Sequence, residues 1–415
     1  TTSTVAYNYQ SSGTQVVSSV PSYGNLTVTG DVNTFKARNA DGNITVTGSL
    51  TVNNNQQFNF LAGSTNSITG SVVLATGSNS INCNSGTVFI GNALTVNTSA
   101  TFAPTSATVT VQGSLTGAGS LSTGGTVILS GTNAQAVSIT TLAFNNLTVN
   151  KTSGTVTFGA AATVNGAFYI QAGTVVFAGN TFTLNGTTTI DGQLNITSSS
   201  GVKTFVGAVT VNGVWNNTGN AAPIFRGGLT VNTGSTFTAG SGVYTFNTND
   251  QSIGGSASIS IPNVTVTGVT LTNNNTLGFQ VSTALSGTGG LTQGTSSLLF
   301  IGGTSAITTL TANANNDNIV NYYGAAQTVK AVSYRNLTLS GSGTKTLTSL
   351  TTINGDLLLD GSAAATTASN LIVGGDITVN NASALTVGGF NLDVTGGVTV
   401  SGGTLDFSSA VGSKQ

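Results

Sequence analysis

The chain has 415 residues, of which 5% are charged, and its formal net charge at pH 7 is -1. It contains no His, no Met and a single Cys, Cys83, and all ten acidic residues are Asp. Without His and with one Cys, the chain cannot build a Ser-His-Asp or Cys-His catalytic group, a His-ligated zinc site or an internal disulfide. Nine Lys and Arg residues are too few for a basic nucleic-acid surface, so we expect no nucleic-acid partner. We also expect no cofactor.

The remaining composition favours β-strands. Hydrophobic residues make up 38% of the chain, Gly occurs 56 times, and Glu, Met and other good helix formers are absent or scarce. We therefore expect an all-β protein with turns made by Gly and Asn. No run approaches 18 apolar residues, so no membrane span is expected, and the Thr at position 1 indicates a processed chain or a fragment.

One short strand motif recurs along the whole chain and alternates apolar with polar residues, as in Asn25-Leu26-Thr27-Val28. Such alternation predicts a strand with one buried face. Turns such as Asn165-Gly166 and Asn185-Gly186 come between these strands, and we expect a positive φ there because Gly and Asn tolerate it. The copies of the motif lie at residues 25–28, 43–46, 94–97, 146–149, 209–212, 229–232, 263–266, 336–339, 377–380 and 398–400.

The spacing of these strands predicts the architecture. Val164, Leu184, Val211 and Val231 are 20, 27 and 20 residues apart, a length that holds two or three short strands and their turns. This rhythm favours a single elongated parallel β-helix, or β-solenoid, of stacked short coils. Tandem β-sandwich domains of about 120 residues remain the alternative.

A longer repeat overlies the short one. A Gln precedes the Asn-Leu-Thr-Val motif at positions 15, 135, 251 and 327, and the motif Asn residues are 121, 117 and 73 positions apart. This predicts about three and a half duplicated segments at residues 1–125, 126–242, 243–318 and 319–415. No charge-rich or Pro-rich linker separates them, so we expect residues 1–415 to form one continuous solenoid.

Stacked coils would place apolar residues in continuous inner columns and Asn side chains in amide ladders, at about 4.8 Å per coil. The open end of a solenoid presents unpaired backbone groups that invite another chain. We therefore expect copies to join head to tail, with residues 1–20 supplying a strand between subunits. The residues predicted to take part in polymerisation are Val5, Tyr7, Tyr9, Val16, Val17, Leu405 and Phe407.

Two segments contain residues of the kinds that chemical sites use. Asp356 and Asp360 would share one face if residues 355–361 formed a single strand, and paired carboxylates cleave glycosides, but a turn at Asp360-Gly361 is the favoured interpretation. Residues 388–394 loosely match one calcium nonapeptide, although such sites need tandem copies. We therefore expect neither enzymatic activity nor a metal site.

The Asn-Leu-Thr-Val motifs, the Asn-Gly turns and the segment from Gln327 to Leu339 resemble repetitive β-solenoid surface proteins and filamentous adhesins of bacteria, particularly the Bacteroidetes type. The resemblance implies an exported, non-enzymatic protein at the cell surface, acting in adhesion, matrix or filament formation. Our first hypothesis is a filament subunit whose main partner is itself, with surfaces or glycans as further partners. The alternatives are a monomeric adhesin stalk, and a polysaccharide-active β-helix enzyme or phage fibre segment.

Overall fold

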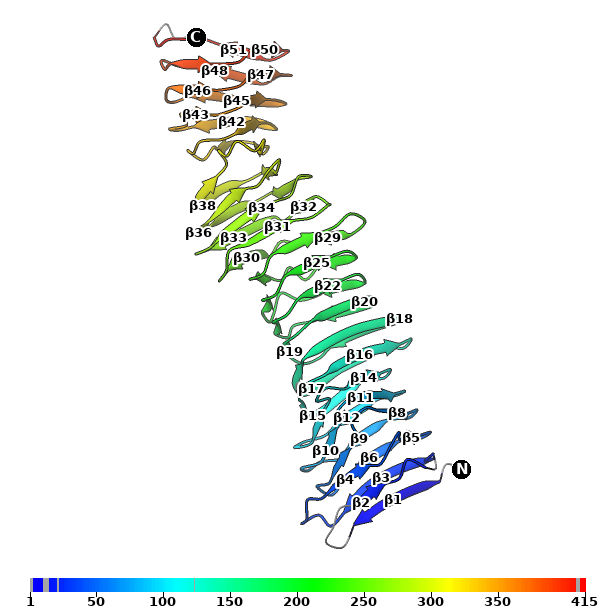
Figure 1. Ribbon diagram of the computed structural model, residues 1–415. Coiled ribbons are helices and arrows are strands. Elements are labelled where there is room, and N and C mark those ends of the chain that lie inside the picture. Colours follow the sequence, from blue (N-terminus) through cyan, green and yellow to red (C-terminus); the bar gives the residue numbers. More distant parts are fainter. Residues whose placement is uncertain (1–2, 10–14, 21, 123, 408–410) are drawn as a thin grey trace. The chain divides into compact units, whose positions relative to one another are not determined.

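The computed structural model describes residues 3–9, 15–20, 22–122, 124–407 and 411–415, and its strands form stacked coils (Figure 1). The chain divides into two compact units, unit 1 with residues 1–207 and 213–219, and unit 2 with residues 208–212 and 220–415. The regular elements of the described residues are all β-strands. Strands of successive coils pair in parallel within each unit, which confirms the parallel β-solenoid. Tandem β-sandwiches are excluded because their strands pair antiparallel.

One column of parallel strands in unit 1 shows how the coils stack. Inward residues of successive coils lie opposite one another, as Leu26 does with Leu50 and Leu94 with Leu115, and these side chains are buried. The apolar columns are therefore continuous from coil to coil, as the alternation predicts. The column consists of β1 (Thr4–Tyr9), β3 (Asn25–Gly30), β6 (Leu50–Val52), β9 (Val72–Leu74), β12 (Leu94–Val96) and β15 (Leu115–Leu121).

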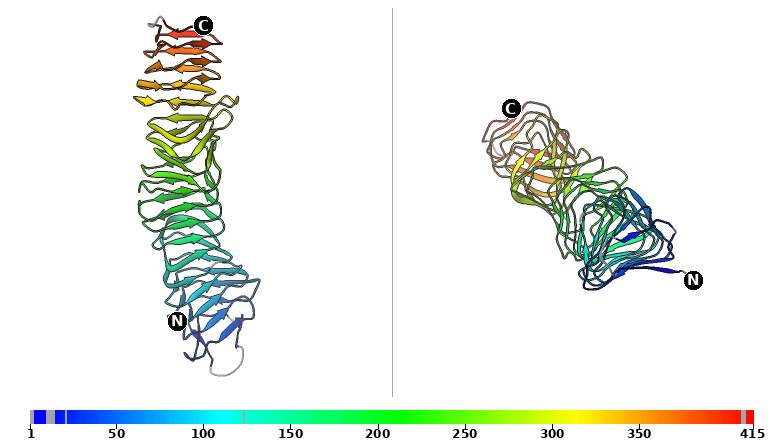
Figure 2. Two further views of the ribbon diagram at one scale, coloured as in Figure 1. Left: turned by 90° about the vertical axis from the view of Figure 1, so that its left-hand side faces the viewer. Right: turned by 60° about the horizontal axis from the view of Figure 1, so that its bottom comes forward.

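The C-terminal part of unit 2 carries three separate parallel sheets, whose strands stack coil by coil (Figure 2). The largest consists of β32 (Ile259–Ser260), β35 (Phe279–Val281), β37 (Leu298–Ile301), β39 (Ile319–Tyr322), β41 (Asn336–Leu339), β44 (Leu357–Leu359), β47 (Ile377–Asn380) and β50 (Val398–Ser401). The second consists of β40 (Gln327–Thr328), β42 (Ser342–Leu347), β45 (Ser362–Thr367), β48 (Ala384–Thr386) and β51 (Thr404–Asp406). The third consists of β43 (Thr352–Ile353), β46 (Leu371–Val373) and β49 (Leu392–Val394).

The outer faces carry the expected amide ladders. On β4 (Ala37–Ala40), β7 (Gln57–Asn59) and β10 (Ser80–Asn82), three Asn side chains lie one above another. Asn59 Nδ2 donates to Asn39 Oδ1 at 2.7 Å, and Asn82 Nδ2 donates to Asn59 Oδ1 at 2.8 Å. Because a stacked amide both donates and accepts, the ladder links adjacent coils through side chains as well as backbone.

The Asn-Gly turns have a different physical basis from the one expected. Gly166 and Gly186 are not among the residues with positive φ, so that expectation is wrong for these two turns. Instead, a Cβ on Gly166 would collide with Asn146 Oδ1, and a Cβ on Gly186 would collide with the backbone of Gly166. Glycine is therefore required because turns of successive coils approach each other closely.

Candidate functional site

The N-terminal coil is made by β1 and β2 (Gln15–Val17), and it leaves the end of an inner column of apolar residues exposed. Val5 lies opposite Leu26, and Tyr7 lies opposite Val28, in the register that buries Leu26 and Val28 completely. Val5 is nevertheless 39% exposed, because β1 pairs with β3 and has no described strand on its other side. An inward position thus becomes a partly exposed apolar surface beside an unpaired strand edge.

Tyr7 is held by a hydrogen-bonded tyrosine pair. The hydroxyls of Tyr7 and Tyr23 lie 2.8 Å apart, Ser18 N donates to the Tyr7 hydroxyl, and the Tyr23 hydroxyl donates to the Ser18 carbonyl oxygen at 2.6 Å. Burial, and then the hydrogen bond with Tyr7, raise the pKa of Tyr23 above its ordinary value. The Tyr23 hydroxyl therefore stays protonated at neutral pH, and the hydrogen bonds of the two tyrosines keep the turn at Ser18 in place.

The same tyrosine arrangement recurs in unit 2. The hydroxyls of Tyr322 and Tyr334 lie 3.1 Å apart, Lys330 N donates to the Tyr322 hydroxyl, and the Tyr334 hydroxyl donates to the Lys330 carbonyl oxygen. Ser18 and Lys330 each follow a repeat glutamine by three positions. The first and last copies of the long sequence repeat thus build one common turn structure.

The C-terminal coil, made by β50 and β51, leaves several inner columns open. Val398 and Val400 lie opposite Ile377 and Val379, which are fully buried, yet Val398 is 49% exposed and Val400 is also exposed. Leu405 continues the column of the buried Leu385 and is itself half-buried. β50 pairs with β47 alone, and β51 with β48 alone, among the described strands.

The structure distributes the seven predicted polymerisation residues over different environments. Val5 and Tyr7 point along the inner columns of the N-terminal coil, whereas Val16 faces outward, opposite Asn39, and is exposed. Val17 is fully buried. Leu405 and Phe407 lie together in the C-terminal coil, where Phe407 is 46% exposed. The side chain of Tyr9 lies outside the described residues. Val398 and Val400 were not among the predicted polymerisation residues, although their alternation with Thr399 is typical of residues that face the core.

Buried lysines hold the repeat glutamines in both units. In unit 1, Gln135 Nε2 donates to two carbonyl oxygens, of Val111 and Gly113, and its Oε1 accepts from Lys151 Nζ at 3.0 Å. Lys151 Nζ also donates to the carbonyl oxygens of Ser130 and Asn133. The amide and the ammonium group together satisfy buried backbone acceptors, which would otherwise cost free energy.

The Gln327 cluster of unit 2 repeats this arrangement. Gln327 Nε2 donates to the carbonyl oxygens of Ile301 (2.8 Å) and Gly303 (2.9 Å), and its Oε1 accepts from Lys345 Nζ at 2.8 Å. Burial lowers the pKa of Lys345 to about 8 and also lowers that of Lys151. Sequence reasoning missed these lysines, but Lys345 alternates in phase with the inward Leu347, a signal that could have revealed them.

Lys203 and Lys414 form a second pair of related sites, one covered and one open. Each ammonium group donates to the carbonyl oxygens two and three residues before it and to one in the preceding coil, at 2.5–2.9 Å for Lys203 and 2.6–3.2 Å for Lys414. Lys203 is 1% exposed, and burial lowers its pKa, whereas Lys414 is only half-buried. The C-terminal coil therefore carries a lysine arranged like one of the interior.

The carboxylates of the candidate catalytic pair accept hydrogen bonds from backbone and side-chain amide groups. Strand β44 spans Leu357–Leu359 only, so Asp356 and Asp360 flank it, and the turn interpretation of Asp360-Gly361 is confirmed. Asp356 Oδ1 accepts from the backbone N–H of Asp376 at 2.9 Å. Asp360 Oδ1 accepts from Gly361 N at 2.8 Å and from Asn381 Nδ2. Both side chains therefore serve as hydrogen-bond acceptors at turns.

Asp356 belongs to a series of inter-coil caps, side chains whose oxygen accepts a hydrogen bond from a backbone N–H of the next coil. Asn336 Oδ1 accepts from the backbone N–H of Asp356 at 3.0 Å, and Asp376 Oδ1 accepts from that of Gly397 at 2.7 Å. The motif asparagines at 25 and 146 do the same, with Ser49 N and Ala167 N as donors. The Asn that opens the Asn-Leu-Thr-Val motif thus caps the next coil.

The calcium-like segment shows the same chemistry. Asn391 Oδ1 accepts from Ser413 N at 2.8 Å, and Asp393 lies on β49 opposite Ile372. Across the ranges that the structure describes, no three His, Cys, Asp or Glu side chains come together in a way that could hold a metal ion. Those ranges also contain no helix long and apolar enough to cross a membrane.

Comparisons of the chain with family models, with curated proteins and with solved structures give no match. The repeated coils, the inter-coil caps and the parallel pairing identify the chain as a β-solenoid repeat protein.

Proposed function

We propose that this protein is a non-enzymatic structural protein whose copies join end to end through their terminal coils and form a filament. The observation that carries the proposal is the exposure of inner-column residues in those coils, Val5 in one and Val398 and Val400 in the other. The filament would lie outside a bacterial cell and serve adhesion or matrix formation, a role supported by the resemblance to filamentous adhesins.

The physical argument starts from the free strand edges. β1 and β50 each have one described partner strand, so one row of backbone N–H and C=O groups faces away from the stack. Placing β50 of one copy against β1 of another would pair these groups and cover the valines of both strands. The interior contacts that each unit makes from coil to coil would then continue between molecules.

The geometry of such a contact favours a head-to-tail chain of copies over a symmetric dimer. The two surfaces that meet, β1 with β2 and β50 with β51, are different parts of the chain, so the contact is heterologous. A heterologous contact that does not close by rotation adds subunits without limit. Lys414 also supports the proposal. It binds carbonyl oxygens as Lys203 does, but Lys203 is buried, whereas Lys414 lies in the terminal coil and is half-buried.

Substitution of the exposed column valine tests the assembly. Wild-type protein should form filaments in negative-stain electron microscopy and sediment as large species, and Val398→Lys should remove both. Ile372→Lys is the matched control, because Ile372 is a 50% exposed β-branched residue on β46, which has partner strands on both sides. Deletion of residues 1–20 should have the effect of Val398→Lys.

Two outcomes would overturn the proposal. Monodisperse wild-type protein at high concentration would favour the monomeric stalk, and filaments that survive Val398→Lys and the deletion would place the contact elsewhere. The non-enzymatic role has its own test, the depolymerisation of polysaccharides by wild-type protein and by Asp356→Asn. Activity that disappears in Asp356→Asn would make the protein an enzyme.

A further inference from the structure

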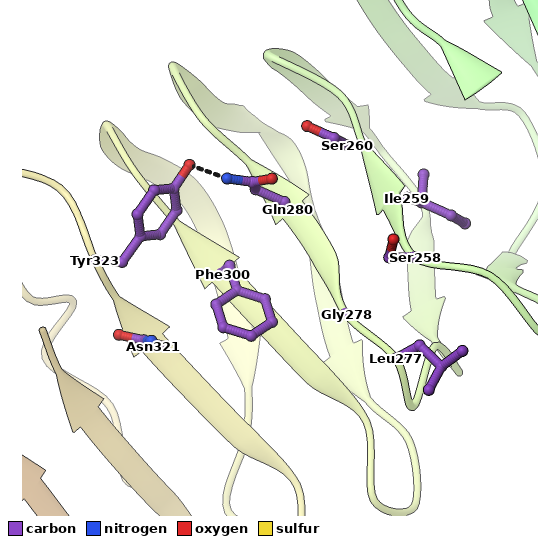
Figure 3. A pocket seen from close by; sticks show the side chains of 9 residues that line it. All are labelled: Ser258, Ile259, Ser260, Leu277, Gly278, Gln280, Phe300, Asn321 and Tyr323. Atoms are coloured by element: carbon purple, nitrogen blue, oxygen red, sulfur yellow. Dashed lines mark hydrogen bonds between the residues drawn. The ribbon is translucent and has the colours of Figure 1, made fainter. Parts of the chain in front are cut away.

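A pocket of about 390 Å³ lies on the outer face of the eight-stranded sheet of unit 2, which runs from β32 to β50 (Figure 3). It extends over four successive strands, whose outward residues Ser260, Gln280, Phe300 and Asn321 lie opposite one another in register. Ser258, Leu277 and Tyr323 also line it. A volume of this size is within the range of small-molecule sites, roughly 300–1,000 Å³.

Two aromatic rings form the apolar part of the pocket. Phe300 and Tyr323 are half-buried, and their centroids lie 6.4 Å apart at an interplanar angle of 73°. Two glycines leave room for them, since a Cβ on Gly278 would lie 2.7 Å from Phe300 Cε2, and one on Gly302 would lie 2.5 Å from the Tyr323 hydroxyl. The rings therefore occupy space that the neighbouring coils leave open.

Polar groups are positioned beside the rings. Gln280 Nε2 donates to the Tyr323 hydroxyl at 2.6 Å, and the two side chains lie on the same side of the strands as Phe300 (Figure 3). Asn321 Oδ1 accepts from the Ser340 hydroxyl at 2.8 Å, which fixes the amide on the other side of Phe300. Hydrogen bonds between side chains hold their rotamers, so the site is organised before a ligand binds.

The chemistry of the lining selects one class of ligand. None of the nine lining residues is charged, so nothing in the pocket would compensate a phosphate or a carboxylate. Strands β35 and β37 have partner strands on both sides, so an extended peptide cannot add to the sheet beneath the rings. The ligand must instead combine an apolar face with a rim of hydroxyl groups.

We propose that the Phe300–Tyr323 pocket binds an uncharged sugar unit of a glycan. The C–H face of a pyranose ring would pack on the ring of Phe300, since aromatic faces are electronegative and attract C–H groups. The amides of Gln280 and Asn321 and the Tyr323 hydroxyl would bind the sugar hydroxyls. None of these residues lies in the terminal coils, so the site is independent of the proposed assembly.

Binding of uncharged oligosaccharides to the intact chain tests the proposal. The probes are tetra- to hexasaccharides of glucose, mannose, galactose and N-acetylglucosamine, measured by isothermal titration calorimetry. At least one should bind wild-type protein, and Phe300→Ala should weaken it at least tenfold, as expected for an aromatic anchor. Phe89→Ala is the matched control, because Phe89 is another half-buried aromatic residue on an outer face, and it should leave binding unchanged.

A second variant covers the case in which Phe300→Ala disturbs folding, which circular dichroism would reveal. Tyr323→Phe keeps the ring but removes the hydroxyl that accepts from Gln280, and it should weaken binding by a smaller factor. The proposal is overturned if no probe binds at millimolar concentration, or if neither variant changes the affinity. Preferential binding of an acidic oligosaccharide, or loss of self-association rather than sugar binding in Phe300→Ala, would also overturn it.

Discussion

Ile377 and Val398 lie opposite each other in one inner column of unit 2, but Ile377 is fully buried and Val398 is 49% exposed. The strand of Ile377 has partners on both sides, whereas the strand of Val398 has one. Lys203 and Lys414 differ in the same way, with similar carbonyl acceptors and unequal burial. Interior and terminal coils are thus built alike and differ in what covers them.

One local sequence pattern can therefore serve two purposes. A coil of a solenoid cannot bury its apolar residues alone, and its stability comes from the neighbours on either side. In the interior, those neighbours belong to the same chain, so an inward valine or isoleucine stabilises the fold. In a terminal coil, the same residue is available to another molecule, so we expect it to contribute to association rather than to stability.

The largest contrast is expected when a charge is placed at each position. Ile377→Lys puts an unpaired ammonium group among buried apolar residues, so the free energy of unfolding should fall by roughly 3–5 kcal/mol. Val398→Lys leaves the charge in solvent and should change that free energy by less than about 1 kcal/mol. Urea unfolding followed by circular dichroism measures both, and equal losses would show that the terminal coil is covered.

Truncation of apolar side chains should give a smaller contrast. Leu357→Ala removes buried methyl groups from an interior coil and should lower the free energy of unfolding by about 2–5 kcal/mol. Val5→Ala, in the N-terminal coil, should lower it by less than about 1 kcal/mol, because Val5 already contacts water. The urea midpoints of the two variants compare these effects, and a loss in Val5→Ala as large as that in Leu357→Ala would contradict the comparison.

Replacing a lysine should likewise cost more stability in an interior coil than in the terminal coil. Lys345→Met leaves the carbonyl oxygens of Gly324 and Ala325 without this donor, so it should cost about 1–3 kcal/mol at pH 7. Lys414→Met should cost less, because water can reach the carbonyl oxygens that Lys414 binds. A larger loss in Lys414→Met, measured by thermal unfolding, would mean that the C-terminal coil is shielded from solvent.

Lys345 also predicts a dependence on pH. Burial lowers its pKa in the folded protein to about 8, from an ordinary 10.5, so between these values the unfolded chain binds more protons. The stability of wild-type protein should therefore rise relative to Lys345→Met as pH increases from 8 to 10.5, and the difference should be constant below that window. Urea unfolding at stepped pH checks this, and a falling difference would mean that the hydrogen bonds of the ammonium group outweigh its desolvation.

The smallest effect is expected from the inter-coil caps. Asn336→Ala removes the acceptor of the Asp356 N–H and should cost about 1 kcal/mol, while Asn336→Asp should retain stability because Asp356 itself plays this role one coil later. Asn391→Ala should cost less, since its donor Ser413 lies in the terminal segment. Differential scanning calorimetry resolves such shifts, and equal losses in Asn336→Ala and Asn336→Asp would show that the cap is not the cause.

Alternation alone identified the buried face of many strands. In β3, the predicted motif Asn25-Leu26-Thr27-Val28 has Leu26 and Val28 buried and the other two residues half-buried, as expected. The buried lysines were missed because a charged residue is ordinarily assigned to the surface. The pocket around Phe300 was missed as well, since Gln280, Phe300 and Tyr323 come from three different coils and no short segment unites them.

The period-2 strands, the Gly- and Asn-rich turns and the parallel solenoid can be predicted from the amino-acid sequence, because these depend on local backbone preferences and on which residues seek burial. The side chains that meet between coils are known from the three-dimensional structure alone. Contacts such as Lys345 with Gln327, Asn336 with Asp356 and Gln280 with Tyr323 join residues 18, 20 and 43 positions apart. These contacts depend on register, since the length of each coil determines which side chains stack, and a small change in that length would bring different residues together.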